Sequence, residues 1–307
     1  MITGVDIGGT KCAVCKGDLK QGIVERHAFP TMDCKQTLMR IEEEIEAMGE
    51  TDAIGISCGG PLDTKRGLIL SPPNLPGWDE VPVIERFSKK FGVPVYLEND
   101  ANACAMAEWR FGAGRGTEHM IFLTFGTGLG AGLILNGRLY NGANGMAGEA
   151  GHIRLAPFGP VGYGKEGSFE GFCSGGGLAQ LGKTAAVRQL QMGKTVSFCS
   201  SFEELDLITA KKIGDCAKEG HEDAKKVFRL CGEMLGKGVS VLIDLFNPER
   251  IVIGSIYERC SELLIPSMEE VLKQECLSDA LRVCSIVPAE LGDSIGDYAA
   301  LSVGMGE

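Results

Sequence analysis

The stretch Gly4-Val5-Asp6-Ile7-Gly8-Gly9-Thr10-Lys11 lies near the start of the chain, and a segment of related design follows at Leu123-Thr124-Phe125-Gly126-Thr127-Gly128-Leu129-Gly130-Ala131-Gly132. Each reads as a hydrophobic strand, a tight turn of Gly and Thr, and a second hydrophobic strand. A turn without bulky Cβ groups lets several backbone N–H donors approach an anion, and the threonine hydroxyls add donors. One such hairpin is a weak signal. Two of them, with an acidic residue just before the first turn, predict two lobes that grip one polyphosphate.

The composition restricts the class of protein. The chain has 307 residues and a mass of 32.7 kDa, which suits one large domain or two of ordinary size, and its 44% hydrophobic residues can form a full core. A net charge of −11 and a pI near 5.0 argue against a general nucleic-acid binder. No apolar run is long enough to span a bilayer, and the first residues lack the features of a signal peptide. We therefore expect a cytoplasmic protein without a nucleic-acid or membrane partner.

The twelve cysteines are scattered, mostly in apolar surroundings. In a cytoplasmic chain this pattern favours reduced core residues over disulfides. The one C-x-x-C pair, Cys12 and Cys15, lies in the second strand of the first hairpin. Side chains alternate along a strand, so these two point to opposite faces, and a shared metal or redox pair is not expected.

The periodicity of apolar residues predicts a duplicated α/β architecture. The first part reads β-β-β-α-β-α-β-α, with later strands at 22–27, 53–57 and 93–97 and helices at 37–48, 82–91 and 101–111. After residue 116 the pattern restarts, with strands at 120–125, 129–135, 251–253 and 283–287 and helices at 175–192, 207–219, 224–246 and 256–274. The last of these helices is expected to kink near Pro266. An apolar helix at 294–303 is expected to pack back on the first lobe. The expected lobes are a small one, 1–112 completed by 292–307, and a larger one, 113–291.

Asp100 follows a buried strand directly and opens a helix. An aspartate there often caps the free N–H groups of the helix. The carboxyl end of a strand in an open α/β sheet is also where ligands bind. A carboxylate at this place could accept the proton of a substrate hydroxyl that attacks a phosphoryl group, and Asn99 beside it could hold a neighbouring hydroxyl.

Further polar residues lie in glycine-rich segments downstream. Glu149 and His152 stand in Gly145-Met146-Ala147-Gly148-Glu149-Ala150-Gly151-His152, and Glu170 comes just before the next helix. A structural histidine and a solvated loop carboxylate are the simpler interpretations of these residues. Together, however, the carboxylates, an amide and an imidazole suit a polyol such as a sugar, whose hydroxyls both donate and accept.

The chain resembles the ROK family of bacterial sugar kinases and repressors over nearly its whole length. Five ordered segments carry the resemblance: Asp6-Ile7-Gly8-Gly9-Thr10-Lys11, Pro73-Asn74-Leu75-Pro76-Gly77-Trp78, Glu98-Asn99-Asp100-Ala101-Asn102, Gly126-Thr127-Gly128-Leu129-Gly130 and Gly148-Glu149-Ala150-Gly151-His152. The resemblance implies the duplicated, actin-like and hexokinase-like ATPase fold (ribonuclease H-like), with two lobes around a cleft. It also implies ATP-dependent phosphorylation of a sugar, assisted by Mg²⁺, and a homodimer.

The resemblance also implies roles for single residues. Asp100 matches the general base, and the positions that match sugar contacts are Asn99, Asp100, Glu149, His152 and Glu170. Gly60 and Asn74 lie in loops expected to line the same cleft. The expected phosphate-binding residues are Gly8, Gly9, Thr10, Lys11, Gly126, Thr127, Gly128 and Gly130. Asp6 is expected to reach the Mg²⁺, directly or through water. Gly254 is expected beside the adenosine, although Ser255 stands where many relatives continue a glycine run.

One segment departs from the family pattern. After the Gly-His pair, family members commonly carry C-x-C-G-x-x-G-C-x-E, whose cysteines bind a structural zinc with the histidine; here Val161, Tyr163 and Ser168 replace the cysteines. Structural zinc takes four ligands and one histidine cannot hold it, so no zinc is expected. Four aromatic residues are expected to stabilise the loop by packing: Phe158, Tyr163, Phe169 and Phe172.

The sequence thus predicts an ATP:hexose phosphotransferase. Glucose, phosphorylated at its 6-hydroxyl, is the first expectation, followed by N-acetylmannosamine, fructose and allose, and polyphosphate stays open as a donor. Two alternatives belong to other classes. One is a sugar-responsive transcription regulator, although the helix-turn-helix domain that such family members carry is not expected ahead of Asp6. The other is a sugar-binding sensor that has lost catalysis.

Overall fold

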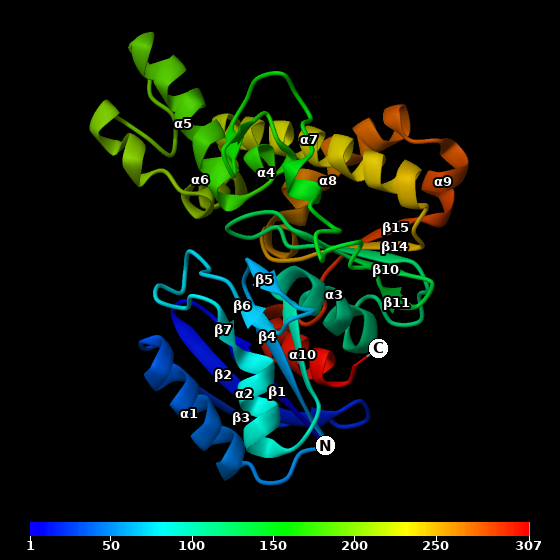
Figure 1. The fold of residues 1–307 in the computed structure, drawn as a ribbon. Coiled ribbons are helices and arrows are strands. Elements are labelled where there is room, and N and C mark those ends of the chain that lie inside the picture. The colour runs from blue at the N-terminus through cyan, green and yellow to red at the C-terminus, as the bar shows by residue number, and fades with distance from the viewer. Residues whose placement is uncertain (307) are drawn as a thin grey trace. The chain divides into compact units, whose positions relative to one another are not determined.

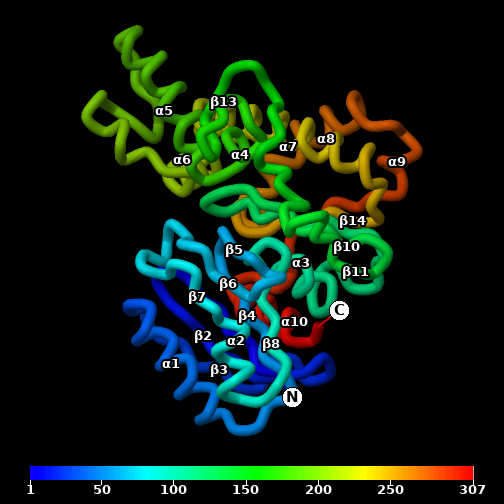
Figure 2. Tube along the Cα trace, in the orientation of Figure 1, coloured from blue at the N-terminus to red at the C-terminus, as the bar shows by residue number. Residues whose placement is uncertain are grey.

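The computed structural model describes residues 1–306 and divides into two compact units. Unit 1 comprises Met1–Phe122, Gly132–Ala147 and the chain from Glu290 onward, and unit 2 comprises Leu123–Ala131 and Gly148–Ala289. Figures 1 and 2 follow the chain through both, with the red C-terminal helix α10 beside the blue N-terminal strands of unit 1. The lobe limits expected from the sequence stay a prediction.

The first sheet lies in unit 1 and positions the residues of interest. Its order is β3 (Gly22–Pro30), β2 (Lys11–Asp18), β1 (Ile2–Ile7), β4 (Ala53–Cys58) and β8 (Val95–Asn99). Strands β1, β4 and β8 are parallel, with Ile7 opposite Cys58 and Cys58 opposite Asn99. Their carboxyl ends therefore meet at one edge of the sheet, and the chain leaves this edge through Gly8, Gly59 and Asp100.

The second sheet repeats the topology of the first. Its order is β11 (Arg138–Leu139), β10 (Ala131–Leu135), β9 (Met120–Leu123), β14 (Arg250–Ile253) and β15 (Ser285–Pro288). When the strands of each sheet are numbered along the chain, both sheets read 3-2-1-4-5. This shared order confirms the duplicated α/β fold that the two glycine turns predict.

Helices cover both faces of the first sheet (Figure 1). On one face, α1 (Cys34–Ala47) and α2 (Val83–Phe91) bury residues such as Ile41 and Phe87 against Val5 and Ile56 of the strands. Asp33 caps α1 by accepting a hydrogen bond from the Gln36 N–H (2.9 Å). On the other face, α3 (Asp100–Phe111) packs on α10 (Ile295–Gly304), which lies against β1 and β4.

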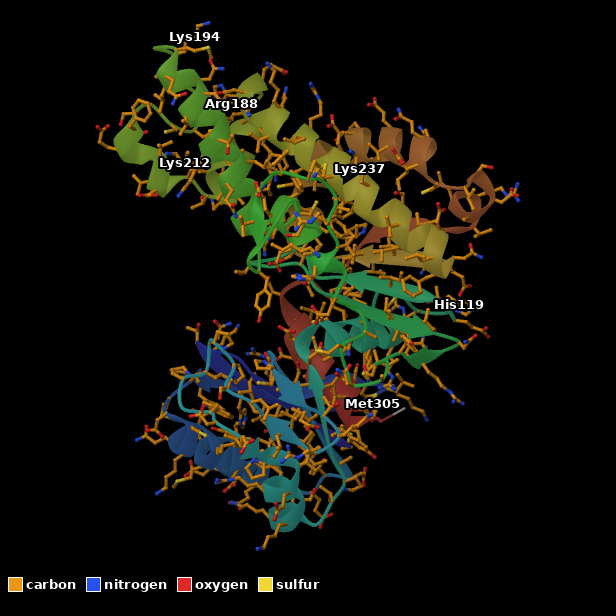
Figure 3. The ribbon with its side chains drawn as sticks, turned by 45° about the horizontal axis from the view of Figure 1, so that its top comes forward. His119, Arg188, Lys194, Lys212, Lys237 and Met305 are labelled. Atoms are coloured by element: carbon orange, nitrogen blue, oxygen red, sulfur yellow. The ribbon has the colours of Figure 1, made fainter. Side chains whose placement is uncertain are left out.

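Unit 2 is mostly helical outside its strands. Its helices are α4 (Phe169–Phe172), α5 (Gly175–Gln191), α6 (Ala210–Lys218), α7 (Glu222–Phe246), α8 (Ile256–Glu275) and α9 (Ser278–Val283). The two longest, α7 and α8, pack together, and Gly232 permits close approach because a Cβ there would lie 2.6 Å from the Leu264 carbonyl oxygen. Other side chains of these helices face outward, among them Lys237 of α7 and Arg188 of α5 (Figure 3).

Short elements complete the two units. They are the strands β5 (Leu62–Asp63), β6 (Leu68–Ile69), β7 (Val81–Pro82), β12 (Val161–Gly162) and β13 (Lys165–Glu166), and the 3-10 turns η1 (Ala150–His152), η2 (Phe202–Leu207) and η3 (Gly292–Ser294). No helix among residues 1–306 is both long and apolar enough to cross a membrane. All twelve cysteines are free, and Cys12 and Cys15 contact different partners, the Gly8 and Asp297 carbonyls.

Several element boundaries differ from the sequence-based expectations; α1, for example, begins at Cys34 and not at residue 37. Strand β9 ends at Leu123 and β10 begins at Ala131, so the second glycine turn is longer than predicted. The distorted residue of α8 is Cys260 (φ −135°), and not the vicinity of Pro266, which stays within helical backbone. Val283 ends helix α9 and does not begin a strand. At the glycine turn and at Val283 an apolar pattern continues past the point where the backbone changes conformation, so periodicity misplaces the end of the element. In α8 the proline does not take its neighbours out of helical φ/ψ.

Candidate active site

Asn99, and not Asp100, is the N-terminal cap of the helix that follows β8. The cap of α3 is Asn99, whose side chain accepts the Asn102 N–H (2.9 Å). Asp100 is the first helical residue, and its Oδ1 accepts the adjacent Ala101 N–H (2.9 Å). Although Asp100 is partly solvent-accessible, desolvation by the surrounding protein raises its pKa. The carboxylate is therefore free of the capping role and binds a proton more readily than an ordinary aspartate.

A buried network of polar side chains lies directly beneath this pair, and the sequence analysis does not predict it. Glu98 is 7% exposed, and its Oε1 accepts the N–H of Asn99 (2.9 Å) and Nδ2 of Asn102 (3.1 Å). Its Oε2 accepts a hydrogen bond from Nδ2 of Asn141 (3.1 Å), and Oδ1 of Asn141 accepts one from Nδ2 of Asn102 (2.8 Å). Burial raises the pKa of Glu98, and these hydrogen bonds oppose the rise. The network fixes the β8–α3 junction that carries Asn99 and Asp100.

Asp6 is the next-to-last residue of β1, near the same sheet edge. Burial, followed by the charges of Asp297 and Asp100, raises the pKa of Asp6 to about 6, although Lys11 and Arg26 partly oppose the rise. Asp297 lies on α10 and forms an ion pair with Arg26 (2.6 Å). No group of three or more His, Cys, Asp or Glu side chains in the described chain, residues 1–306, is placed to hold a metal ion. Mg²⁺ is commonly bound by one or two carboxylates together with phosphate and water, so Asp6 is chemically suited to be one ligand, directly or through water.

The first glycine turn, Gly8–Lys11, leaves two backbone donors available. The Gly8 N–H donates to the Lys11 carbonyl (3.1 Å), which closes the turn, and Thr31 donates from its hydroxyl to the Gly8 carbonyl (2.6 Å). No residue among 1–306 accepts a hydrogen bond from the N–H of Gly9 or Thr10. Phosphate binding by this turn stays a prediction. The groups available for it are these two N–H groups and the exposed side chains of Thr10 and Lys11.

The second glycine turn, Gly126–Gly130, is arranged similarly within unit 2. Gly126 donates to the Gly128 carbonyl (3.1 Å), Gly130 to the Thr124 hydroxyl (2.8 Å), and Leu129 to Oε2 of Glu170 (3.0 Å). The N–H groups of Thr127 and Gly128 find no acceptor in the described chain. Here too, two adjacent donors remain for an anion.

Glu149, His152 and Glu170 all lie in unit 2. Glu149 and His152 are exposed, at the start and end of the turn η1. Gly148 precedes them with a φ of +89°, and a Cβ there would lie 2.2 Å from the Ala131 carbonyl oxygen, so only glycine fits. Glu170 lies in the single turn α4, which Ser168 caps by accepting the Gly171 N–H (3.1 Å).

The loop at residues 153–168 is held by hydrogen bonds. Gln180 of α5 donates to the Val161 carbonyl and accepts its N–H, both at 2.9 Å, and Lys165 donates to the His152 carbonyl (2.7 Å). The aromatic packing expected from the sequence is only half present: Phe169 and Phe172 are buried, whereas Phe158 and Tyr163 are 77% and 88% exposed. Packing therefore comes from α4, and the outer part of the loop depends on polar bonds.

The residues present do not fit a structural zinc. Among residues 1–306 no group of three or more His, Cys, Asp or Glu side chains is placed to hold a metal ion. Val161 and Tyr163 offer no metal-binding group of the kind that zinc takes, and the Ser168 hydroxyl is engaged in capping α4. The absence of zinc stays a prediction that metal analysis of the purified protein can test: one zinc per chain would contradict it.

Gln180→Leu is expected to loosen this loop. It removes both bonds to Val161, so the free energy of unfolding is expected to fall by about 1 kcal/mol and amide hydrogen exchange at 153–168 to accelerate. The matched control is Gln191→Leu at the exposed end of the same helix, for which no change is expected. Equal exchange in both variants would show that Gln180 does not hold the loop.

The remaining predicted site residues lie at loop positions. Gly60 precedes Pro61 in a cis peptide bond, and Asn74 packs on the first glycine turn, where a Cβ on Gly9 would lie 2.6 Å from its carbonyl oxygen. Gly254 follows β14 and donates to the Leu123 carbonyl (3.0 Å). Depressions of about 340 Å³ at Arg110 and about 300 Å³ at Tyr257 include none of the predicted site residues.

If the protein is the kinase that the sequence predicts, the acid limb of its pH–rate profile is expected to reflect the protonation of Asp100. A general base must be ionised, and the raised pKa of Asp100 means that it becomes protonated above the usual aspartate range near pH 3.9. With Mg-ATP saturating and sugar below KM, kcat/KM is therefore expected to rise with pH, with a midpoint above that range. A flat profile down to about pH 4 in folded protein would contradict the assignment.

Comparison with known proteins places this chain in a family. The ROK family matches residues 2–303. The glucokinase of Streptomyces coelicolor is 31% identical over 299 residues, covering 95% of this chain and 94% of that enzyme. The xylose repressor of Caldicellulosiruptor bescii is 33% identical over 285 residues, covering 89% of this chain and 70% of the repressor.

This chain is also similar in fold to a solved structure of a ROK family protein. The ROK family glucokinase from Streptomyces griseus, in complex with glucose and AMPPNP, superposes with a TM-score of 0.76 at 30% identity, covering 100% of this chain and 99% of that one. The actin-like ATPase fold implied by the sequence is thereby confirmed. From the match over nearly the whole chain we conclude that the protein belongs to the ROK family.

Proposed function

We propose that this protein is an ATP-dependent sugar kinase that phosphorylates a hexose hydroxyl, with Asp100 as general base. The observation that carries the proposal is the division of roles at the β8–α3 junction. Asn99 caps the helix, which leaves the Asp100 carboxylate free, with a raised pKa, at the sheet edge where β1 and β4 also end. The two glycine turns, each with two N–H groups that find no acceptor among residues 1–306, support phosphate binding.

In the proposed reaction, Asp100 accepts the proton of the sugar hydroxyl as its oxygen attacks the γ-phosphoryl group of ATP, and ADP leaves. The N–H groups of Gly9 and Thr10, and those of Thr127 and Gly128, stabilise negative charge on the phosphates. Asp6 would hold Mg²⁺, which neutralises phosphate charge when bound. The Glu98 network keeps Asn99 and Asp100 in place while the proton moves.

The sugar-binding assignments extend the proposal to unit 2. Glu149, His152 and Glu170 match the family's sugar contacts, and each offers a polar group suited to a hydroxyl. Glucose, phosphorylated at its 6-hydroxyl, is the first proposed substrate, because the S. coelicolor relative is a glucokinase and the S. griseus structure contains glucose. N-acetylmannosamine, fructose and allose are the next candidates. Assembly as a homodimer stays a prediction.

The first experiment measures ADP formation from Mg-ATP against a panel of hexoses and N-acetylhexosamines. Turnover on one sugar is expected, and it would name the substrate. A panel repeated with polyphosphate in place of ATP tests the alternative donor.

A second candidate is a sugar-binding sensor or regulator without catalysis. The similarity to the xylose repressor, at 33% identity, is the observation that favours it. The two candidates separate in one comparison: sugar binding by calorimetry without turnover on any sugar of the panel would favour the sensor and overturn the kinase.

A further inference from the structure

Glu170 makes a contact that sugar binding does not require. Its Oε2 accepts the Leu129 N–H at 3.0 Å. This bond joins the second glycine turn to a residue 41 positions further along the chain. No other residue among 1–306 occupies its second oxygen, Oε1. One carboxylate oxygen thus holds the turn, and the other is available to a ligand.

The surroundings of Glu170 are shaped for this contact. Glycines stand at three neighbouring positions where a side chain would displace it or its backbone. A Cβ on Gly128 would lie 2.7 Å from Oε2, a Cβ on Gly162 would lie 2.8 Å from Cβ of Glu170, and a Cβ on Gly151 would lie 3.3 Å from that same atom. None of the three has a positive φ, so their backbone conformations do not themselves demand glycine. Gly128 thus leaves room for the carboxylate itself, whereas Gly151 and Gly162 leave room for the backbone around Glu170, at the Leu129 carbonyl and the Gly171 nitrogen.

We propose that Glu170 is a positioning residue of the second glycine turn: by accepting the Leu129 N–H, it aims the N–H groups of Thr127 and Gly128 at the nucleotide phosphates. The inference rests on the proposed function, which assigns this turn to phosphate binding. It deepens that function, because the same carboxylate that is expected to contact the sugar then also sets nucleotide affinity.

The alternative is that Glu170 serves the sugar alone. In that case its loss changes sugar affinity and leaves nucleotide affinity as it was. A residue that positions the turn differs, because its loss weakens nucleotide binding even when no sugar is present. A variant that keeps an acceptor at the same reach is then expected to restore part of that binding.

The experiment titrates Mg-AMPPNP into the full chain by calorimetry, without sugar. Glu170→Ala is expected to weaken nucleotide binding about tenfold, since a hydrogen bond to a charged acceptor is lost. Glu170→Gln keeps a side-chain oxygen for the Leu129 N–H and is expected to retain most of the affinity. The matched control is Glu233→Ala on α7, which removes a carboxylate that makes no hydrogen bond to the turn among residues 1–306; its affinity for Mg-AMPPNP is expected to equal that of the wild type.

A double-mutant cycle tests the contact from the other side. Gly128→Ala adds a methyl group 2.7 Å from Oε2, so it is expected to displace the carboxylate and to weaken nucleotide binding. In the Glu170→Ala background that clash is gone, and the second substitution is expected to cost little more. If Glu170→Ala fails to fold, the cycle cannot be completed, and the Gly128→Ala and Glu170→Gln variants test the contact instead. Weakened nucleotide binding in the first and retained binding in the second are then expected, and wild-type binding by Gly128→Ala would overturn the positioning role.

The outcomes separate the inference from the proposed function. If the wild type does not bind Mg-AMPPNP, the proposed kinase function fails. If the wild type binds and Glu170→Ala binds equally well, or if the effects of the two substitutions simply add, the positioning role is overturned while the kinase stands. Weakened binding in Glu170→Ala, partial recovery in Glu170→Gln and a non-additive cycle support it.

Discussion

Asp100→Asn is expected to lower kcat by a factor on the order of 10² to 10⁴, because it removes a positioned general base. The amide is nearly isosteric and can still accept the Ala101 N–H, while the cap of α3 belongs to Asn99 and is untouched. The variant is therefore expected to fold as the wild type does. The measurement is ADP formation at saturating Mg-ATP and saturating sugar, with circular dichroism and thermal unfolding of the same sample.

The matched control is Asp279→Asn. Asp279 is likewise an exposed aspartate in the first turn of a helix, α9, and its ion pair with Arg282 (3.1 Å) lies at the surface. Its substitution is expected to leave kcat unchanged, since exposed pairs contribute little to stability. Full activity in a folded Asp100→Asn sample would refute the assignment of Asp100, and the loss of folding in that sample would show that the residue is structural.

The sequence predicts the fold well because its signals are local. Each glycine turn lies between two hydrophobic strands, and the strand–helix order repeats, so periodicity alone yields the two related sheets. It also predicts that Asp100 lies at a strand end, because Leu97 closes a buried run just before it. These features depend on neighbours within a few residues, which a sequence displays directly.

The parts of the site that the sequence did not predict involve contacts between distant segments. Glu98 pairs with Asn141, 43 residues away, and Leu129 with Glu170, 41 residues away. No local sequence pattern indicates that the two members of either pair are in contact. One signal is present in the sequence: Glu98 directly follows the buried Leu97, and a buried carboxylate needs hydrogen-bond donors such as asparagine side chains.

The sequence also does not show which backbone N–H groups of the two glycine turns remain available to a ligand. The sequence assigns every N–H of the two glycine turns to phosphate, whereas Gly8, Gly126 and Gly130 use theirs within their own turns or on Thr124. Which N–H groups remain depends on the dihedral angles of each turn, and glycine, which allows many, gives the least information about them.

Gly55→Ala is expected to destabilise unit 1 by about 3 kcal/mol or more, at or beyond the upper end of overpacking substitutions. Gly55 lies in β4 beneath α10, where an added Cβ would lie 2.0 Å from the Gly304 nitrogen and 2.3 Å from the Ala300 carbonyl oxygen. These are backbone atoms, so no side chain can rotate away and the whole helix has to move. The measurement is urea unfolding followed by circular dichroism.

The matched control is Gly176→Ala in the first turn of α5, where the nearest atom to a new Cβ lies 3.9 Å away. Alanine is favoured over glycine in a helix, so this variant is expected to be neutral or slightly stabilised. The comparison also bears on function, because α10 carries Gly296 and Asp297 against Asp6. If Gly55→Ala shifts α10, Mg-nucleotide affinity is expected to fall even at temperatures where the variant stays folded. A Gly55→Ala protein as stable as Gly176→Ala would contradict backbone-to-backbone packing of α10 on β4, and with it the reason that Asp297 lies close enough to raise the pKa of Asp6.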